Sequence, residues 1–178
     1  MGHAAGAHLV SMLLVQPAFL EAAGFRNAAT NIRGAALVSG PFSGRLMEES
    51  FLARMTYLYW AFGHNQTRWQ PSFPAHHTQL QLAGIVGEAV PELPPLLLLN
   101  AEWDWGLLEH TAEWEMALNA TGADVRSEVI LGTNHLSVIS GLNRRLSQAE
   151  ETLKPLVLQF CQKVLKDVPP GTDQHRTL

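Results

Sequence analysis

Two short apolar segments bounded by turn-forming residues constrain the fold of this chain most strongly. Residues 34–40 read Gly-Ala-Ala-Leu-Val-Ser-Gly, and residues 96–100, which follow two prolines, read Leu-Leu-Leu-Leu-Asn. Strands that are buried on both faces of a parallel sheet have such near-continuous apolar sequences. Residues 127–131, Ser-Glu-Val-Ile-Leu, alternate well enough to predict a third strand.

Segments with helical spacing separate these strands. Apolar side chains recur with that spacing in residues 5–16, 45–62, 106–120, 136–142 and 148–166. Asp104 is a candidate N-cap for the helix at 106–120, and Gly122 ends that helix. Residues 63–77 are expected to form a loop. Strands that alternate with helices predict an α/β fold: a three-layer sandwich with a mostly parallel sheet between two helical layers.

Composition supports a single globular domain. The chain has 178 residues, of which 47% are hydrophobic and 16% charged, so it is long and apolar enough to bury a core. We expect one domain over residues 1–166 and a disordered polar tail over residues 167–178. The net charge of −4 gives no basic footprint for nucleic acid, and we expect no such partner.

The sequence also bears on location. No apolar run approaches the roughly 20 residues that a membrane helix needs, so we expect no membrane partner. No Lys or Arg precedes the apolar residues 7–15, which argues against a signal peptide. Cys161 is the single cysteine and is compatible with a reducing compartment. We therefore expect a cytoplasmic protein.

The first residues of the chain contain the frame of a sharp turn from strand into helix. In Gly2-His3-Ala4-Ala5-Gly6, two glycines flank a central position, as in turns that present a nucleophile at the end of a strand. We expect both glycines to provide bare backbone where strand and helix approach closely. The central residue should be serine, but it is Ala4, which has no hydroxyl and cannot form an acyl intermediate.

Two further residues lie where an open α/β sheet places reactive groups, at the carboxyl ends of strands. Asp104 follows the strand at 96–100, and His135 follows the strand at 127–131. In the order nucleophile, acid, histidine, His135 would act as general base and then general acid, while Asp104 would hold the imidazole in the required tautomer. Plainer roles remain open: Asp104 as an N-cap, Glu102 as the acid, and His135 as a surface residue.

The remaining candidates are weaker. Trp103 and Trp105 flank Asp104 and are expected to line an apolar substrate pocket. The histidines show no clear zinc-ligand spacing, and the chain has no cysteine pair, so we expect no metal site and no cofactor. We do not expect another serine to replace the missing nucleophile. The serines considered are Ser11, Ser39 and Ser43.

These residues together resemble the kynurenine formamidase (arylformamidase) and small carboxylesterase branch of the α/β-hydrolases. In that branch a serine stands at the position of Ala4, and Asp104 and His135 occupy the places of the acid and the histidine. The segments that carry the resemblance are residues 2–9, 37–42, 96–108 and 134–135. They span about residues 2–142, which correspond to the C-terminal half of the usual domain.

The resemblance implies a relative of serine hydrolases that act on carboxylic esters or aryl formamides, with a small apolar or aromatic ester or amide as substrate or ligand. It also implies departures: the serine, the strand entering the turn and a His-Gly-Gly loop are missing, and only the N–H of Ala5 remains for the oxyanion hole. We expect an inactive or severely impaired chain, or alternatively a ligand-binding or interaction pseudoenzyme. An exposed sheet edge at residues 35–39 would favour self-association.

Overall fold

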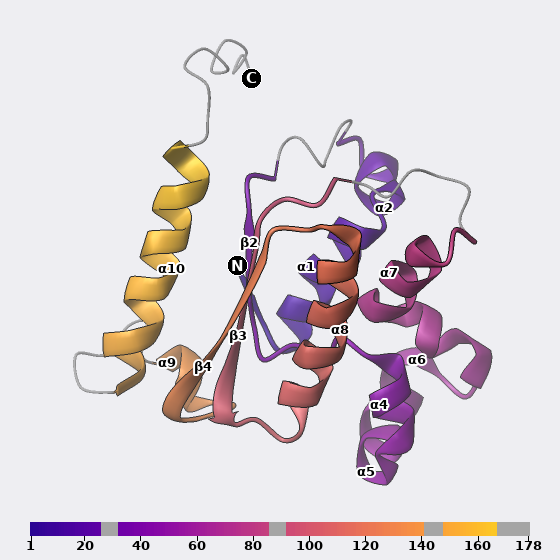
Figure 1. Cartoon of the computed structure of the whole chain (residues 1–178). Helices are drawn as coiled ribbons and strands as arrows, with labels where there is room; N and C mark the ends of the chain where they lie inside the picture. The colour runs from indigo at the N-terminus through magenta and orange to yellow at the C-terminus, as the bar shows by residue number, and fades with distance from the viewer. Residues whose placement is uncertain (26–31, 86–91, 141–147, 167–178) are drawn as a thin grey trace.

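The computed structural model of the chain describes residues 1–25, 32–85, 92–140 and 148–166. The sheet in this part of the chain has four parallel strands in the order β1-β2-β3-β4 (Figure 1). The strands are β1 (Gly2–His3), β2 (Ala35–Val38), β3 (Leu96–Trp103) and β4 (Val125–Asn134). The predicted α/β class with a parallel sheet is confirmed. Strands β3 and β4 each run three residues beyond the predicted ends, which brings Asp104 directly to the end of β3.

Alternating side chains of β3 fill two separate cores, because successive strand residues point to opposite faces. Leu96 and Leu98 pack with Trp114 and Leu118 of α8 (Leu107–Thr121) and with apolar residues of α1 (Ala5–Val15). Leu97 and Leu99 pack on the other face with Val138 of α9 (Ser137–Ser140) and Leu153 of α10 (Gln148–Lys166). Figure 1 shows α10 and the short α9 on one side of the sheet and α1 and α8 on the other, which confirms the three-layer sandwich.

Most predicted helices agree with the structure to within a residue or two. Helices α1, α8 and α10 form where helical spacing predicted them, and Gly122 ends α8 with φ 81°. Two further helices are α2 (Ala18–Ala22), which starts after Pro17, and α7 (Pro74–Leu82). The helix predicted at 136–142 is described only as α9, because residues 141–147 lie outside the described part of the chain. The predicted tail at 167–178 also lies outside it.

The single helix predicted at 45–62 is wrong. The segment divides into α4 (Gly44–Glu49), α5 (Phe51–Ala53), a π-helical turn η1 (Arg54–Leu58) and α6 (Tyr59–Phe62). The break lies at Ser50, whose backbone is extended and whose hydroxyl accepts the Ala53 N–H, so Ser50 caps a new helix. The apolar side chains of Phe51, Leu52 and Met55 in this segment are exposed.

The loop predicted at 63–77 is largely helical and packed. It contains the 3-10 turns η2 (Gln66–Arg68) and η3 (Gln70–Ser72) and the start of α7. Trp69 lies between the two turns, is buried, and donates its indole N–H to the Gly63 carbonyl at 2.9 Å. Together with Met47, Leu58 and Phe73 it forms a third core, which holds α4 and η1 against the residues that precede α7.

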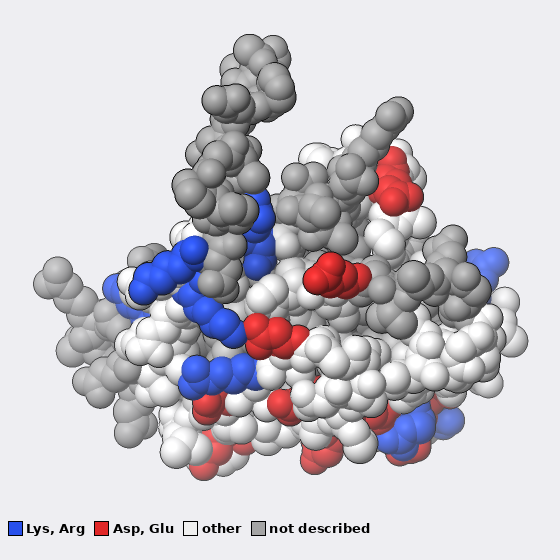
Figure 2. Space-filling view, turned by 45° about the horizontal axis from the view of Figure 1, so that its top comes forward, with Lys and Arg blue, Asp and Glu red and all other residues white. Residues whose placement is uncertain are grey.

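The surface carries charges of both signs. On the face shown in Figure 2, several basic side chains gather on the left, and acidic side chains lie beside them and along the lower edge. Surface ion pairs join Arg126 to Glu128 at 2.9 Å and Lys163 to Asp124 at 2.8 Å. Within the described ranges, no helix has the length and apolar character required to cross a membrane.

Candidate active site

A strained turn joins β1 to α1. Ala4 has φ 50° and ψ −120°, a backbone region that residues with a side chain rarely adopt. Its N–H donates to the Val38 carbonyl at 2.9 Å. A Cβ added to Gly2 would lie 2.5 Å from the Gly6 carbonyl oxygen, so glycine is required at position 2. A Cβ added to Gly6 would meet nothing within 4 Å, so the predicted need for bare backbone at Gly6 is wrong.

The N-terminus of α1 follows this turn at once. Ala5 is the first residue of the helix, and the first N–H groups of a helix have no intrahelical acceptor. They also form the positive end of the helix dipole. Ala4 and Ala5 both line a cavity at this point, so the structure places a methyl group and a helix N-terminus on the cavity wall.

Asp104 and His135 are brought together by adjacent strands. Asp104 follows β3 and His135 follows β4, and His135 Nδ1 lies 2.7 Å from Asp104 Oδ1. The other carboxylate oxygen, Oδ2, accepts from the Asn100 amide at 2.9 Å and from the Ala101 N–H at 3.2 Å. Asp104 is 3% exposed and His135 8%, so this network is shielded from water. Such shielding strengthens its hydrogen bonds.

The structure decides between the alternative roles of the acidic residues. Asp104 does not cap α8: the cap position is Gly106, which has φ 86° and no side-chain hydrogen bond. The predicted N-cap is wrong because the Asp104 carboxylate is occupied by His135 and by groups of β3. Glu102, the rival acid, instead accepts the Gly132 N–H at 2.7 Å.

Two aromatic rings hold His135 in place. Trp105, with φ 51°, stacks on it with centroids 4.7 Å apart. The His3 ring lies at 4.8 Å, and His3 Nε2 is 2.9 Å from the His135 carbonyl. Burial lowers the pKa of His3, so a neutral ring donates to that carbonyl. With its Nδ1–H donated to Asp104, His135 keeps the Nε2 lone pair for accepting a proton.

The cavity beside this pair has a volume of about 460 Å³ and a mostly apolar wall. Its wall includes Ala4, Ala5, His135 and Trp105, so the strained turn and the histidine bonded to Asp104 face one space. Both Trp103 and Trp105 were predicted to line a pocket. Trp105 lies on this wall, but the prediction for Trp103 is wrong, because its side chain is 61% exposed and is not part of the wall. Trp103 is still part of β3, whose residues alternate between faces, while Trp105 follows the bend at Asp104. The other lining residues are Ser39, Pro41, Leu46, Met47, Ser50, Ala53, Tyr57, Gly106, Leu107, Glu109 and His110.

Two polar residues of this wall were not predicted to line it: Ser39 was considered only as a replacement nucleophile, and His110 was given no role. Ser39 follows β2 with φ 52°, is fully buried, and its hydroxyl has no hydrogen-bond partner within the described residues. Its place after a strand is the signal that also identified Asp104 and His135. His110 lies within α8, and its Nδ1 accepts the Ser43 N–H at 3.1 Å. Burial lowers its pKa to about 4. No sequence pattern marks His110.

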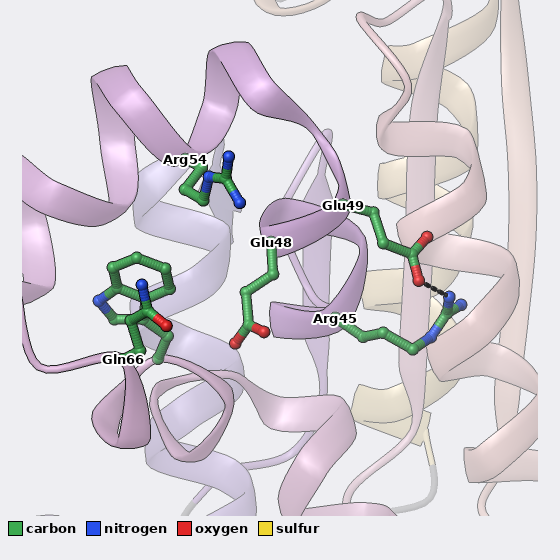
Figure 3. Close-up of a pocket in the computed structure, with 6 residues that line it drawn as sticks. Arg45, Glu48, Glu49, Arg54 and Gln66 are labelled. Atoms are coloured by element: carbon green, nitrogen blue, oxygen red, sulfur yellow. Dashed lines mark hydrogen bonds and ion pairs between the residues drawn. The ribbon is translucent and has the colours of Figure 1, made fainter.

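A second hollow, drawn in Figure 3, lies on α4 and η1 and has a volume of about 290 Å³. Its walls carry charged side chains, including an ion pair between Arg45 and Glu49 at 2.6 Å, and Arg45 also pairs with Glu113. It contains none of the predicted site residues. In the part of the chain that the structure describes, no cluster of three His, Cys, Asp or Glu side chains is arranged to hold a metal ion.

Comparison with solved structures identifies the fold. The Pyrococcus horikoshii acylaminoacyl peptidase superposes with a TM-score of 0.67 at 16% identity, over 97% of this chain and 24% of that chain. The structure of the esterase EstE5, in EstE5-PMSF, gives a TM-score of 0.57 at 17% identity, over 93% of this chain and 52% of that one. No protein-family model matches the sequence, and a search of curated proteins gives no significant match. The chain therefore has the α/β-hydrolase fold and spans about half or less of these two proteins.

Proposed function

We propose that this protein is a relative of serine hydrolases of carboxylic esters or aryl formamides that retains the acid and the base but is inactive or severely impaired in hydrolysis. One observation carries the proposal. Ala4 holds the strained backbone of a nucleophile turn and shares a cavity with His135, yet presents a methyl group. Without a hydroxyl no covalent intermediate forms, whatever the quality of the base.

The roles of the other residues follow from their contacts. His135 Nε2 would accept the proton of a nucleophile at position 4, and Asp104 would stabilise the imidazolium through the 2.7 Å contact to Nδ1. The N–H of Ala5 at the start of α1 would stabilise a developing oxyanion. The likeness to a peptidase and an esterase supports this chemistry at the level of the fold.

A fluorophosphonate probe, which labels activated serines, tests the proposal. The native chain should not label, and Ala4→Ser should label because the turn and the pair are in place. Ala4→Ser combined with His135→Ala is the matched control and should lose the label, since no base remains. Labelling of the native chain would overturn the assignment of position 4. Absence of label on a folded Ala4→Ser chain, with folding checked by circular dichroism, would overturn the hydrolase relationship of the site.

The cavity favours a second function, binding without turnover. Its volume of about 460 Å³ lies within the range of small-molecule sites, and the Trp105 ring lies against His135 on the wall. A small apolar or aromatic ester or amide fits this chemistry. Tight binding of phenyl acetate by the native chain, with no phenol released, would support it, and failure to bind would contradict it.

A further inference from the structure

The cavity contains a hydrogen-bond donor that the acid–base pair does not use. His110 Nδ1 accepts the Ser43 N–H at 3.1 Å, so that nitrogen carries the lone pair. In a neutral imidazole the proton then resides on Nε2, which becomes a donor. Across the described ranges, no residue accepts this Nε2–H. Because His110 lines the cavity, the donor is available to a ligand there.

The charges around His110 determine which ligand group can receive its Nε2–H hydrogen bond. Burial is the main cause that lowers its pKa to about 4, and Arg45 acts in the same direction, while Glu113 and Glu109 oppose it. The ring is therefore neutral at neutral pH and offers a hydrogen bond rather than a positive charge. A carboxylate on the ligand would gain no ion pair here and would lie near two acidic residues. A neutral oxygen acceptor fits this environment.

Ser39 gives an independent indication that a polar ligand group enters the cavity. Three buried side-chain atoms lack a partner among the described residues, and only Ser39 Oγ belongs to a residue of this wall. His3 pairs with Val38 across β1 and β2, so Ser39 lies next to Ala4 at the carboxyl end of the sheet. An unsatisfied buried hydroxyl costs about 1–3 kcal/mol, and a ligand oxygen or N–H would satisfy it.

We infer that His110 is a specificity-determining residue, which selects esters or amides whose apolar acyl chain carries a second, neutral oxygen acceptor such as a ketone. This inference rests on the proposed function for the reacting end of the ligand. The acyl chain occupies the apolar wall, and its ketone accepts the His110 Nε2–H. An acyl chain with methylene in place of the ketone leaves that donor without a partner, which costs affinity.

Two matched esters test this inference on the native chain: p-nitrophenyl 4-oxopentanoate and p-nitrophenyl pentanoate, which differ by a ketone in place of a methylene. Affinities are measured by isothermal titration calorimetry. The ketone ester should bind preferentially to the native chain, and His110→Asn should lower that preference by about tenfold, the worth of one such hydrogen bond. The Asn Oδ1 can still accept the Ser43 N–H, so the wall keeps its internal bond.

His110→Gln is the complementary variant, because its Nε2 restores a donor where that of histidine lies. It should retain part of the preference, which a purely structural role of His110 would not predict. Equal preference in the native chain and in His110→Asn, with both folded by circular dichroism, would overturn the inference. So would the absence of measurable binding of either ester to the native chain.

The experiment separates this inference from the proposed function. A native chain that prefers the ketone ester, beside an Ala4→Ser chain that neither labels nor hydrolyses, would keep the specificity role and reject the hydrolase relationship of the site. An Ala4→Ser chain that hydrolyses both esters, with a ratio of kcat/KM values unchanged by His110→Asn, would keep the hydrolase relationship and reject the specificity role.

Discussion

The two sides of the cavity differ in how completely their polar atoms are used. On the β3–β4 side, both carboxylate oxygens of Asp104 have partners, and His135 Nδ1 is bonded to one of them. On the β1–β2 side, Ser39 Oγ has no partner among the described residues, and Ala4 offers only a methyl group. Backbone strain is common to both sides, since Ala4, Ser39 and Trp105 all have positive φ.

This difference shows what maintains the strained turn at Ala4. The Ala4 N–H donates to the Val38 carbonyl at 2.9 Å, and the Ser39 N–H donates to the Leu99 carbonyl at 2.7 Å. These bonds belong to the sheet and do not depend on which side chain occupies position 4. The backbone geometry of the turn at Ala4 is therefore held by main-chain bonds, whichever side chain occupies position 4.

The largest loss of stability should come from a substitution on the β3–β4 side. Asp104→Ala leaves the Nδ1–H of His135 and the N–H groups of Asn100 and Ala101 without their acceptor. Leaving a buried donor without its acceptor costs about 1–3 kcal/mol, and this variant leaves three such donors. We expect that loss in the free energy of unfolding, measured by urea denaturation with circular dichroism.

Glu102→Ala is the control for that measurement. Glu102 also accepts a hydrogen bond from a backbone N–H, that of Gly132, but this bond is exposed. Its loss should cost less than about 1 kcal/mol. Equal losses for the two variants would contradict the view that the buried network makes the β3–β4 side the stable one.

A pH titration should reveal His110, the buried neutral histidine of the cavity wall. The pKa of His110 is about 4 in the folded chain and 6.5 as its ordinary value. Between these values the unfolded state binds more protons, so stability is complete above pH 6.5 and declines as pH falls towards 4. The shift corresponds to a loss of about 3 kcal/mol.

His110→Asn provides the comparison for that titration, because asparagine does not titrate. Burial also lowers the pKa values of His3 and His8, so the native chain and the variant should both lose stability on acidification. The native chain should lose more, and the difference between the two curves is the contribution of His110. Parallel curves from pH 7 to pH 4 would show that His110 is not buried as a neutral ring.

The sequence predicted the proximity of Asp104 and His135 better than the cavity around them. Asp104 and His135 follow predicted strands, and parallel strands end at one edge, so their proximity follows from topology alone. The same rule applied to Ser39 would have placed a third polar residue there. The β3–β4 register that sets the 2.7 Å contact is a property of the assembled sheet.

The segment from α4 to α6 could not be predicted from spacing. Phe51 and Leu58 have helical spacing, yet only Leu58 is buried. The π-helical turn η1 lies between them and changes the helical register, so spacing alone does not predict which face is buried. Similarly, His110 reads as an ordinary helical residue. Its burial comes from the contact between α8 and the residues before α4, a tertiary arrangement without a local signal.

A matched pair of glycine variants tests the turn itself. Gly2→Ala places a Cβ 2.5 Å from the Gly6 carbonyl oxygen, a contact that forces β1 away from α1. We expect a loss of about 2 kcal/mol, within the range for overpacking. Gly6→Ala meets nothing within 4 Å and lies in a helix, so it should gain about 0.5–1 kcal/mol. Thermal unfolding followed by circular dichroism would measure both effects. A destabilised Gly6→Ala variant would contradict the open space around Gly6.

The smallest expected effect concerns the backbone strain at Ala4. Ala4→Gly removes the Cβ that conflicts with φ 50° and ψ −120°. Strain of this kind costs on the order of 1–3 kcal/mol, but glycine also gives the unfolded chain more freedom, so the net gain should be about 1 kcal/mol. Ala7→Gly, the same substitution inside α1 at a buried position, should instead lose at least about 1 kcal/mol. Changes of opposite sign in the free energy of unfolding of the two variants, measured by urea denaturation, would establish that position 4 stores strain. A loss of stability in Ala4→Gly would place the strain elsewhere in the turn.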